Sequence, residues 1–315
     1  MQMKLNKAAF VIVVLLLLAM AAAFASTFFL KNRMLEADKT DYYICAADYP
    51  TYSISRMIIN DVPNMHLSML TQPQIQGYTA YELSNWDKAL LEQADAIVYM
   101  GDGFESFDTY TNDIAAIINL LSLVELEPIP DNCTVLDFSD EETAITNSPW
   151  LYITPAGALK LCETMCGSMA YLDQAYSSGY YLNLDEAYAL LTPLIESYAE
   201  TEELKGLKVA VAHDALLYTA KEFGADVRLY IRRSTGQTLS DEEIDKCIEA
   251  IEAEGISVML IEKQENAEFV ARFELSGITV IQQDLMLDMA ASFGFEGLTD
   301  AYLNNIAEIK RAFAQ

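Results

Sequence analysis

A histidine and an aspartate are the residues of this chain whose type and position best suit ligand chemistry. His213, followed by Asp214, ends a predicted strand, and Asp284 directly follows another. Imidazole nitrogens and carboxylate oxygens are both ligands of Zn²⁺ and Mn²⁺. His66, the only other histidine, begins a predicted strand without acidic or histidine neighbours at ligand spacing, so we interpret it as structural. Two histidines cannot make a three-histidine site, so any metal must also use oxygen ligands.

Two further pairs of charged residues follow predicted strands, and each pair has two interpretations. Asp102 and Glu105 flank Gly103 and are either hard oxygen ligands or an exposed acidic turn. Arg232 and Arg233 either grip a carboxylate or phosphate, or form surface ion pairs with the many acids of the chain. The residue types alone leave both questions open.

Aromatic residues cluster on the segments that follow the predicted strands. Such residues either pack between two halves of a protein or line a pocket for an organic ligand. Gln74, Gln76 and Ser148 lie close by in sequence and would supply neutral hydrogen-bonding groups to such a pocket. The aromatic residues concerned are Tyr49, Tyr52, Tyr78, Tyr81, Trp150 and Tyr152.

The overall charge excludes several classes of partner. The 315 residues include 47 Asp and Glu against 19 Lys and Arg, for a formal net charge of −28. Nucleic acid requires clustered basic residues, so we expect no nucleic-acid partner. An anionic bilayer surface is disfavoured for the same reason. The sequence contains no nucleophile elbow, phosphate-binding loop, HExxH motif or dinucleotide fingerprint, and we predict no enzymatic activity.

The N-terminus carries a segment typical of export. Ala8–Leu30 is uncharged and mostly apolar, and lysines precede and follow it. About 20 such residues are needed to cross a bilayer. We favour an uncleaved anchor, with a signal peptide cleaved after Ala23–Ala25 as the alternative. Either outcome places the rest of the chain outside the cytoplasm. Without residues 1–40, 14 basic and 45 acidic residues remain, a net charge of −31.

Strand-length and helix-length segments alternate along the chain, and these elements must position the candidate residues. The alternation indicates parallel sheets flanked by helices. We predict an α/β fold with two lobes, each with a mainly parallel four-stranded sheet. The predicted strands are Tyr42–Ala46, His66–Thr71, Ala96–Gly101, Cys133–Phe138, Lys208–His213, Val227–Ile231, Val258–Glu262 and Thr279–Gln283. The predicted helices are Ser53–Asn60, Ser84–Ala94, Phe104–Ser122, Ala156–Ala175, Leu184–Leu204, Ala215–Phe223, Asp241–Glu254, Ala267–Leu275 and Thr299–Phe313.

Several segments together resemble one family. They are YPTYSISRMI, YELSNWDKALLEQADAIVYMGDGFE, KVAVAHDALLYTAKEFG and GISVMLIEKQENAEFVARFELSGITVIQQD, and the similarity covers most of residues 42–313. In this order they resemble the TroA-like proteins, which deliver zinc or manganese to ABC importers. The resemblance implies two α/β lobes joined by one long helix, here about Ala156–Tyr176.

The resemblance also implies which residues bind the metal. The family takes one ligand from each of four loops, usually three histidines and an acidic residue. His213, in AHDALLY, matches the third histidine, and Asp284, in IQQD, matches the acidic ligand. The first histidine position falls on Tyr78 or Thr79, and the second falls on Ser148. Two of the four family ligands are therefore replaced by other residues.

We therefore expect an extracytoplasmic solute-binding protein that captures Zn²⁺ or Mn²⁺ between its lobes and delivers it to a membrane ABC permease. It would act as a monomer, with residues 1–40 as anchor and tether, 41–155 as the first lobe, 156–178 as the linking helix and 179–315 as the second lobe. Asp102, Glu105 or water would replace the missing ligands. The alternative is a membrane-anchored protein of the same fold that holds a small organic or anionic ligand against Tyr78, Trp150, Tyr152 and Arg232.

Overall fold

The computed structural model describes residues 41–70, 83–101, 115–126, 128–139, 149–233, 237–263, 265–286 and 294–314. The predicted anchor, Ala8–Leu30, lies outside this set. Among the helices that are described, none is long and apolar enough to cross a membrane. Tyr43–Gln315 forms a single compact unit.

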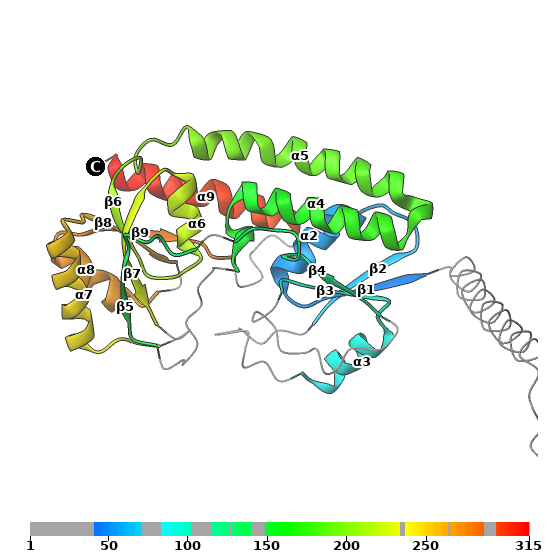
Figure 1. Cartoon of the computed structure of the whole chain (residues 1–315), viewed down its shortest axis with the longest axis horizontal. Coiled ribbons are helices and arrows are strands. Elements are labelled where there is room, and N and C mark those ends of the chain that lie inside the picture. The colour runs from blue at the N-terminus through cyan, green and yellow to red at the C-terminus, as the bar shows by residue number, and fades with distance from the viewer. Residues whose placement is uncertain are drawn as a thin grey trace, which may run out of the picture. The chain divides into compact units, whose positions relative to one another are not determined.

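The first sheet has four strands in the order β2-β1-β3-β4 (Figure 1). Their bounds are β1 (Tyr42–Ala46), β2 (Met65–Met69), β3 (Ala96–Tyr99) and β4 (Ala116–Asn119). The pairs β1–β3 and β3–β4 are parallel. Helix α3 (Asn85–Gln93) buries Leu91 against Cys45 and Ile97 of the sheet, whereas α2 (Tyr49–Ile59) contacts β2 and β3. Figure 1 shows α2 and α3 on opposite faces.

The second sheet has five parallel strands in the order β5-β7-β6-β8-β9. Helices α7 (Asp241–Glu254) and α8 (Ala267–Leu275) cover one face, where Ile231, Met259 and Phe273 belong to one buried cluster. Because side chains alternate along a strand, the residues between these core positions face the other side. The strands are β5 (Thr134–Asp137), β6 (Lys208–Val211), β7 (Asp226–Arg232), β8 (Val258–Glu262) and β9 (Thr279–Gln283).

The remaining helices include a long segment between β5 and β6 of the second sheet. The chain passes through η3 (Leu151–Ile153), α4 (Pro155–Leu172), η4 (Gln174–Tyr176) and α5 (Ser177–Ala199) to β6, and continues through α6 (Leu216–Glu222). Helices α4 and α5 lie side by side and both contact α2 (Figure 1). The last helix, α9 (Phe295–Phe313), contacts α2 as well as β9. The predicted linking helix, about Ala156–Tyr176, corresponds to α4 and η4, which together with α5 lie in the chain between β5 and β6 of the second sheet.

Local signals account for several element ends. Ser240 accepts from the backbone N–H of Glu243, whose carboxylate accepts from the backbone N–H of Ser240 in return, so α7 begins with a capping box. Gly255 ends α7 with a positive φ of 67°, the conformation that favours glycine at a helix C-terminus. The bounds of α7, α8, β8 and β9 agree with the sequence prediction.

Two predictions about strands are wrong. The predicted helix Phe104–Ser122 contains β4, where the β-branched Ile117 and Ile118 favour a strand. The predicted strand Cys133–Phe138 was assigned to the first lobe, but β5 pairs with β7 at the edge of the second sheet. The sheets therefore have four and five strands rather than four each. Strand β5 is largely exposed, and local sequence cannot specify a partner about 90 residues away.

Candidate functional site

The ends of the strands in the second sheet bring together residues that are far apart in sequence. Val211, at the end of β6, is level with Tyr230 of β7 and with Leu260 of β8. His213 comes two residues later and is therefore level with the ends of β7 and β8. Asp284 directly follows β9, on the other side of β8. Because strands lie about 4.8 Å apart, the backbones that carry His213 and Asp284 are about 10 Å apart.

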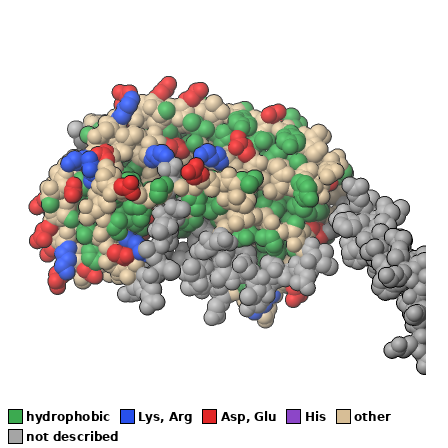
Figure 2. Space-filling view, in the orientation of Figure 1, with side chains coloured by type: hydrophobic (Ala, Val, Ile, Leu, Met, Phe, Trp, Pro, Cys, Tyr) green, Lys and Arg blue, Asp and Glu red, His purple; other side chains and the backbone are tan. Residues whose placement is uncertain are grey.

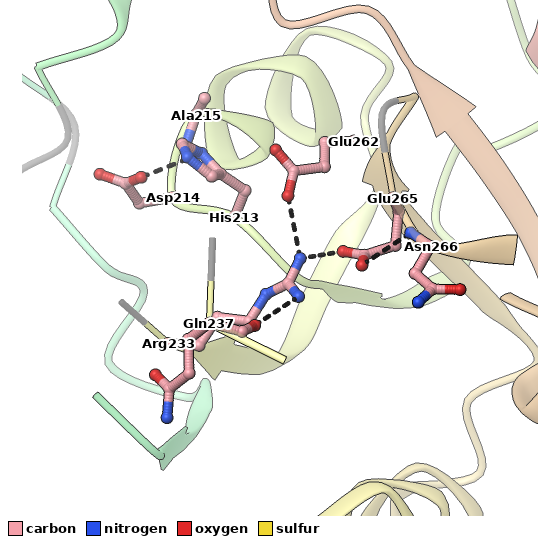
Figure 3. Close-up of polar contacts among 8 residues, drawn as sticks. All are labelled: His213, Asp214, Ala215, Arg233, Gln237, Glu262, Glu265 and Asn266. Carbon is pink, nitrogen blue, oxygen red and sulfur yellow. Dashed lines mark hydrogen bonds and ion pairs between the residues drawn. The ribbon is translucent and has the colours of Figure 1, made fainter. Parts of the chain in front are cut away.

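His213 is held by contacts with its two following residues (Figure 3). Its Nδ1 lies 3.1 Å from Oδ1 of Asp214 and 3.1 Å from the backbone nitrogen of Ala215. The His213 side chain is 15% exposed, so it is neither buried in the core nor free in solvent. These contacts fix the Nδ1 side of the ring.

The contacts at Nδ1 fit two tautomers. If Nδ1 carries the proton, it donates to Asp214, and Nε2 keeps a lone pair that a metal can accept. If Nδ1 is bare, it accepts from the N–H of Ala215, and Nε2 carries the proton. The Ala215 N–H also contacts the Asp214 carboxylate, so it has a partner in the first tautomer as well.

Trp150 supports this arrangement from the other side of Asp214. Its indole Nε1 donates to Oδ2 of Asp214 at 3.1 Å, and its ring meets the His213 ring edge-on with centroids 5.0 Å apart. The Asp214 carboxylate therefore has one oxygen for Trp150 and one for His213. Burial raises the pKa of the Asp214 carboxyl above its ordinary value, and the contacts with His213, Ala215 and Trp150 oppose this rise.

A close backbone contact between η3 and the first turn of α4 fixes the position of the segment that carries Trp150. A Cβ added to Gly157, in the first turn of α4, would lie 1.8 Å from the carbonyl oxygen of Leu151. Only glycine therefore lets η3 pack this closely against α4. Thr154 caps α4 by accepting from the N–H of Gly157, and Tyr152 donates from its hydroxyl to the carbonyl of Leu285.

Asp284 has different surroundings. Its Oδ1 accepts from the N–H of Met286 at 2.9 Å, while its own N–H donates to Oδ1 of Asn305 at 2.7 Å. The amide nitrogen of Asn305 returns a bond to the Asp284 carbonyl at 3.1 Å. The remaining oxygen, Oδ2, lies 3.6 Å from the Lys263 ammonium. The carboxylate is oriented, and its outer oxygen already faces a cation.

Arg232, the last residue of β7, and Arg233, which follows it, both form ion pairs. Arg233 contacts the carboxylates of Glu262 and Glu265, and its guanidinium lies 5.2 Å from the ring centroid of Phe269 (Figure 3). Arg232 pairs with Asp137 of β5 at 2.9 Å. Both arginine side chains are less than 10% exposed. These pairs support the ion-pair interpretation rather than an anion grip.

Several predicted site residues cannot be placed. Tyr78, Thr79, Asp102, Glu105 and Ser148 lie outside the described residues. Within the described part of the chain, no group of three or more His, Cys, Asp or Glu side chains is arranged to hold a metal ion. His213 and Asp284 are the two predicted family ligands that lie among the described residues.

The other predicted candidates are structural. His66 is exposed and stacks on Tyr43, with ring centroids 4.9 Å apart, as expected for a residue outside the site. Tyr49 and Tyr152 are buried and hydrogen-bonded to the backbone at Gly294 and Leu285. These tyrosines pack the interior instead of lining a pocket.

Two residues that matter to this geometry were not assigned a role from sequence. Lys263 was recognisable only as a residue that follows a strand, and nothing in sequence indicated its pairing with Asp284. Asn305 lies in the middle of α9, 21 residues after Asp284, and no local pattern distinguishes it. Its contact depends on how α9 packs against β9.

The fold is shared with solved structures of low sequence identity. A manganese complex of the solute-binding protein FpvC from Pseudomonas aeruginosa superposes with a TM-score of 0.74 at 18% identity, covering 88% of this chain and 99% of that one. A structure of ZnuA gives 0.66 at 19% identity, covering 86% and 99%. A mutant of the laminin-binding adhesin Lmb from Streptococcus agalactiae gives 0.66 at 16% identity, covering 87% and 98%.

Sequence comparison identifies the family. None of the curated proteins compared with the chain matches it. The family model of ZnuA, described as zinc-uptake complex component A, periplasmic, matches residues 44–315. That match spans both sheets and the helices described above. The chain therefore belongs to the ZnuA family of metal-binding solute-binding proteins.

Proposed function

We propose that this protein captures a divalent transition metal, Zn²⁺ or Mn²⁺, outside the cytoplasm and delivers it as a monomer to a membrane ABC permease. The family match over residues 44–315 supports solute binding for metal import. The observation that carries the proposal is His213, which lies at the end of a central strand with Nδ1 against a buried carboxylate. In the tautomer in which Nδ1 donates to Asp214, Nε2 keeps the lone pair that would bind the metal.

The chemistry of the proposed site follows from its donors. His213 supplies one nitrogen and Asp284 supplies carboxylate oxygen, and the remaining ligands come from Asp102, Glu105 or water. A site with a single imidazole and several oxygens suits Mn²⁺ at least as well as Zn²⁺. The organic-ligand alternative is weaker, because Arg232 is occupied by Asp137 and Trp150 donates to Asp214.

The proposed location depends on the N-terminal segment. We propose that Ala8–Leu30 anchors the protein to the membrane and that residues 31–40 connect it to the folded unit. The folded part would then act beside the permease. Acidic side chains are scattered over the face seen in Figure 2. N-terminal sequencing of the protein recovered from membranes would distinguish an intact anchor from a cleaved signal peptide.

The metal proposal is tested by titration calorimetry of chelator-stripped protein with Zn²⁺ and with Mn²⁺. We expect binding of at least one ion and a matching rise in melting temperature, since the ion binds only the native state. His213→Ala should weaken binding by more than about 100-fold, because even residues that merely support a ligand contribute 10–100-fold.

His66→Ala is the matched control, since His66 is exposed and remote from the strand ends of the second sheet. It should leave metal affinity unchanged. If the stripped protein binds neither ion, metal capture is excluded. If His213→Ala binds as tightly as the unmodified protein, the assignment of the ligand is wrong, although metal binding itself would stand.

A further inference from the structure

The pairing of Lys263 with Asp284 is built into the second sheet. Glu262 at the end of β8 is level with Gln283 at the end of β9, so Lys263 and Asp284 are the first residues beyond neighbouring strands. The backbone N–H of Lys263 donates to the Gln283 carbonyl at 2.8 Å, which extends the ladder by one bond. The register therefore places the Lys263 side chain beside Asp284, and their charged atoms lie 3.6 Å apart.

The contact involves Oδ2, the Asp284 carboxylate oxygen that is not bonded to the Met286 N–H. Oδ1 is bonded to the N–H of Met286, and the backbone N–H and carbonyl are both bonded to Asn305. Oδ2 is the oxygen that faces Lys263. A metal bound through the outer oxygen of Asp284 would need the place that the ammonium now occupies.

We propose that Lys263 is an internal competitor of the metal at Asp284, which lowers the affinity for the cargo and speeds its release. This inference rests on the proposed metal-binding function. An ammonium and a divalent ion cannot share one side of a carboxylate oxygen, because both are cations. Lys263 is 58% exposed on a flexible stem, so it can leave for solvent at little cost when the metal enters.

The displaced lysine still acts on the bound metal. Its stem remains attached beside Asp284, so its positive charge stays within several ångströms of the ion and favours dissociation. A protein that must give up its cargo to a permease benefits from affinity that is limited in this way. The effect should decrease as salt screens the two charges.

The test is Lys263→Met, which keeps the length of the stem and removes the charge. We expect Mn²⁺ and Zn²⁺ to bind about 3- to 10-fold more tightly by calorimetry, with slower dissociation in chelator-chase kinetics. The difference from the unmodified protein should narrow as NaCl is raised from low to about 0.5 M. Lys246→Met is the matched control, since Lys246 forms a similarly exposed pair with Glu242 on α7.

Each outcome of this test either supports or overturns the inference about Lys263. Tighter binding by Lys263→Met but not by Lys246→Met supports the inference, and so does binding that appears only after Lys263 is removed. Equal or weaker binding by Lys263→Met overturns the inference while leaving metal capture intact. If neither protein binds an ion, both the inference and the proposed function are wrong.

Discussion

The ends of β6 and β9 offer a cation two different surroundings, although they lie in the same sheet. At the end of β6, His213 is backed by Asp214, which brings negative charge behind a nitrogen ligand. At the end of β9, the carboxylate of Asp284 is backed by backbone and amide groups and faces Lys263. The Asp214 carboxylate places negative charge beside His213, whereas the Lys263 ammonium places positive charge beside Asp284.

The difference indicates how affinity and release are divided between the two residues. A carboxylate behind a histidine raises the basicity of the imidazole and fixes its tautomer, which strengthens the bond to a metal. A lysine beside a carboxylate has the opposite effect, because it must be displaced. We therefore expect the β6 end to dominate affinity and the β9 end to moderate it.

Removing the charge of Asp214 should have the largest effect on this comparison. In Asp214→Asn, one acceptor oxygen remains for two donors, the indole of Trp150 and the imidazole of His213. One of these two donors then loses its acceptor oxygen. The His213 tautomer that carries its proton on Nδ1 is no longer favoured by a neighbouring negative charge. We expect metal affinity to fall by about 10- to 100-fold in calorimetric titration.

The control for Asp214→Asn is Asp137→Asn in the same sheet. It removes the negative charge of Asp137, the β5 residue that pairs with Arg232, and leaves the end of β6 intact. Metal affinity should therefore change by less than about 2-fold. Asp214→Asn with normal affinity would mean that Asp214 does not prepare His213. The ends of β6 and β9 would then not differ in how neighbouring charges affect the binding of a cation.

A substitution in α4 should disturb the β6 end indirectly. Gly157→Ala places a methyl group against the carbonyl of Leu151, so η3 must move and take Trp150 with it. We expect a loss of about 1–3 kcal/mol in the free energy of unfolding, which is typical of overpacking. Metal affinity should fall by about 10-fold, at the lower end of effects from supporting residues.

Gly167→Ala is the matched substitution in the same helix. No atom outside the surrounding turns of α4 lies within 4 Å of the added methyl group, and alanine is the better helix former, so stability should rise by about 0.5–1 kcal/mol with unchanged metal affinity. Denaturant unfolding followed by circular dichroism measures both variants. Equal stability of the two variants would show that the contact between η3 and α4 is not tight.

The sequence predicts the elements of the second sheet well because their signals are local. The capping box at Ser240, the glycine at 255 and the apolar runs of β8 and β9 lie within the segments that they define. Strand β5 is different, because its place beside β7 depends on a pairing between distant segments. The prediction of four strands in each lobe is wrong for this reason.

The site shows the same limit. His213 and Asp284 could be selected from sequence because they follow strands and match a family pattern. The contacts that distinguish their surroundings could not, because Trp150 reaches Asp214 across 64 residues and Asn305 reaches Asp284 from a helix. Lys263 becomes the partner of Asp284 only through the register of β8 and β9. Residue type indicates the ligands, whereas packing determines how strongly each can bind.

The smallest expected effect concerns the indole of Trp150. Trp150→Phe keeps a ring beside His213 but removes the donor to Oδ2 of Asp214. Asp214 retains its contact with Nδ1 of His213, so metal affinity should fall by only about 3-fold, less than for Asp214→Asn. Trp86→Phe is the control, since Trp86 is 67% exposed on α3 and should change nothing. A larger loss of metal affinity for Trp150→Phe than for Asp214→Asn would contradict this ranking, in which the indole acts on His213 through the Asp214 carboxylate.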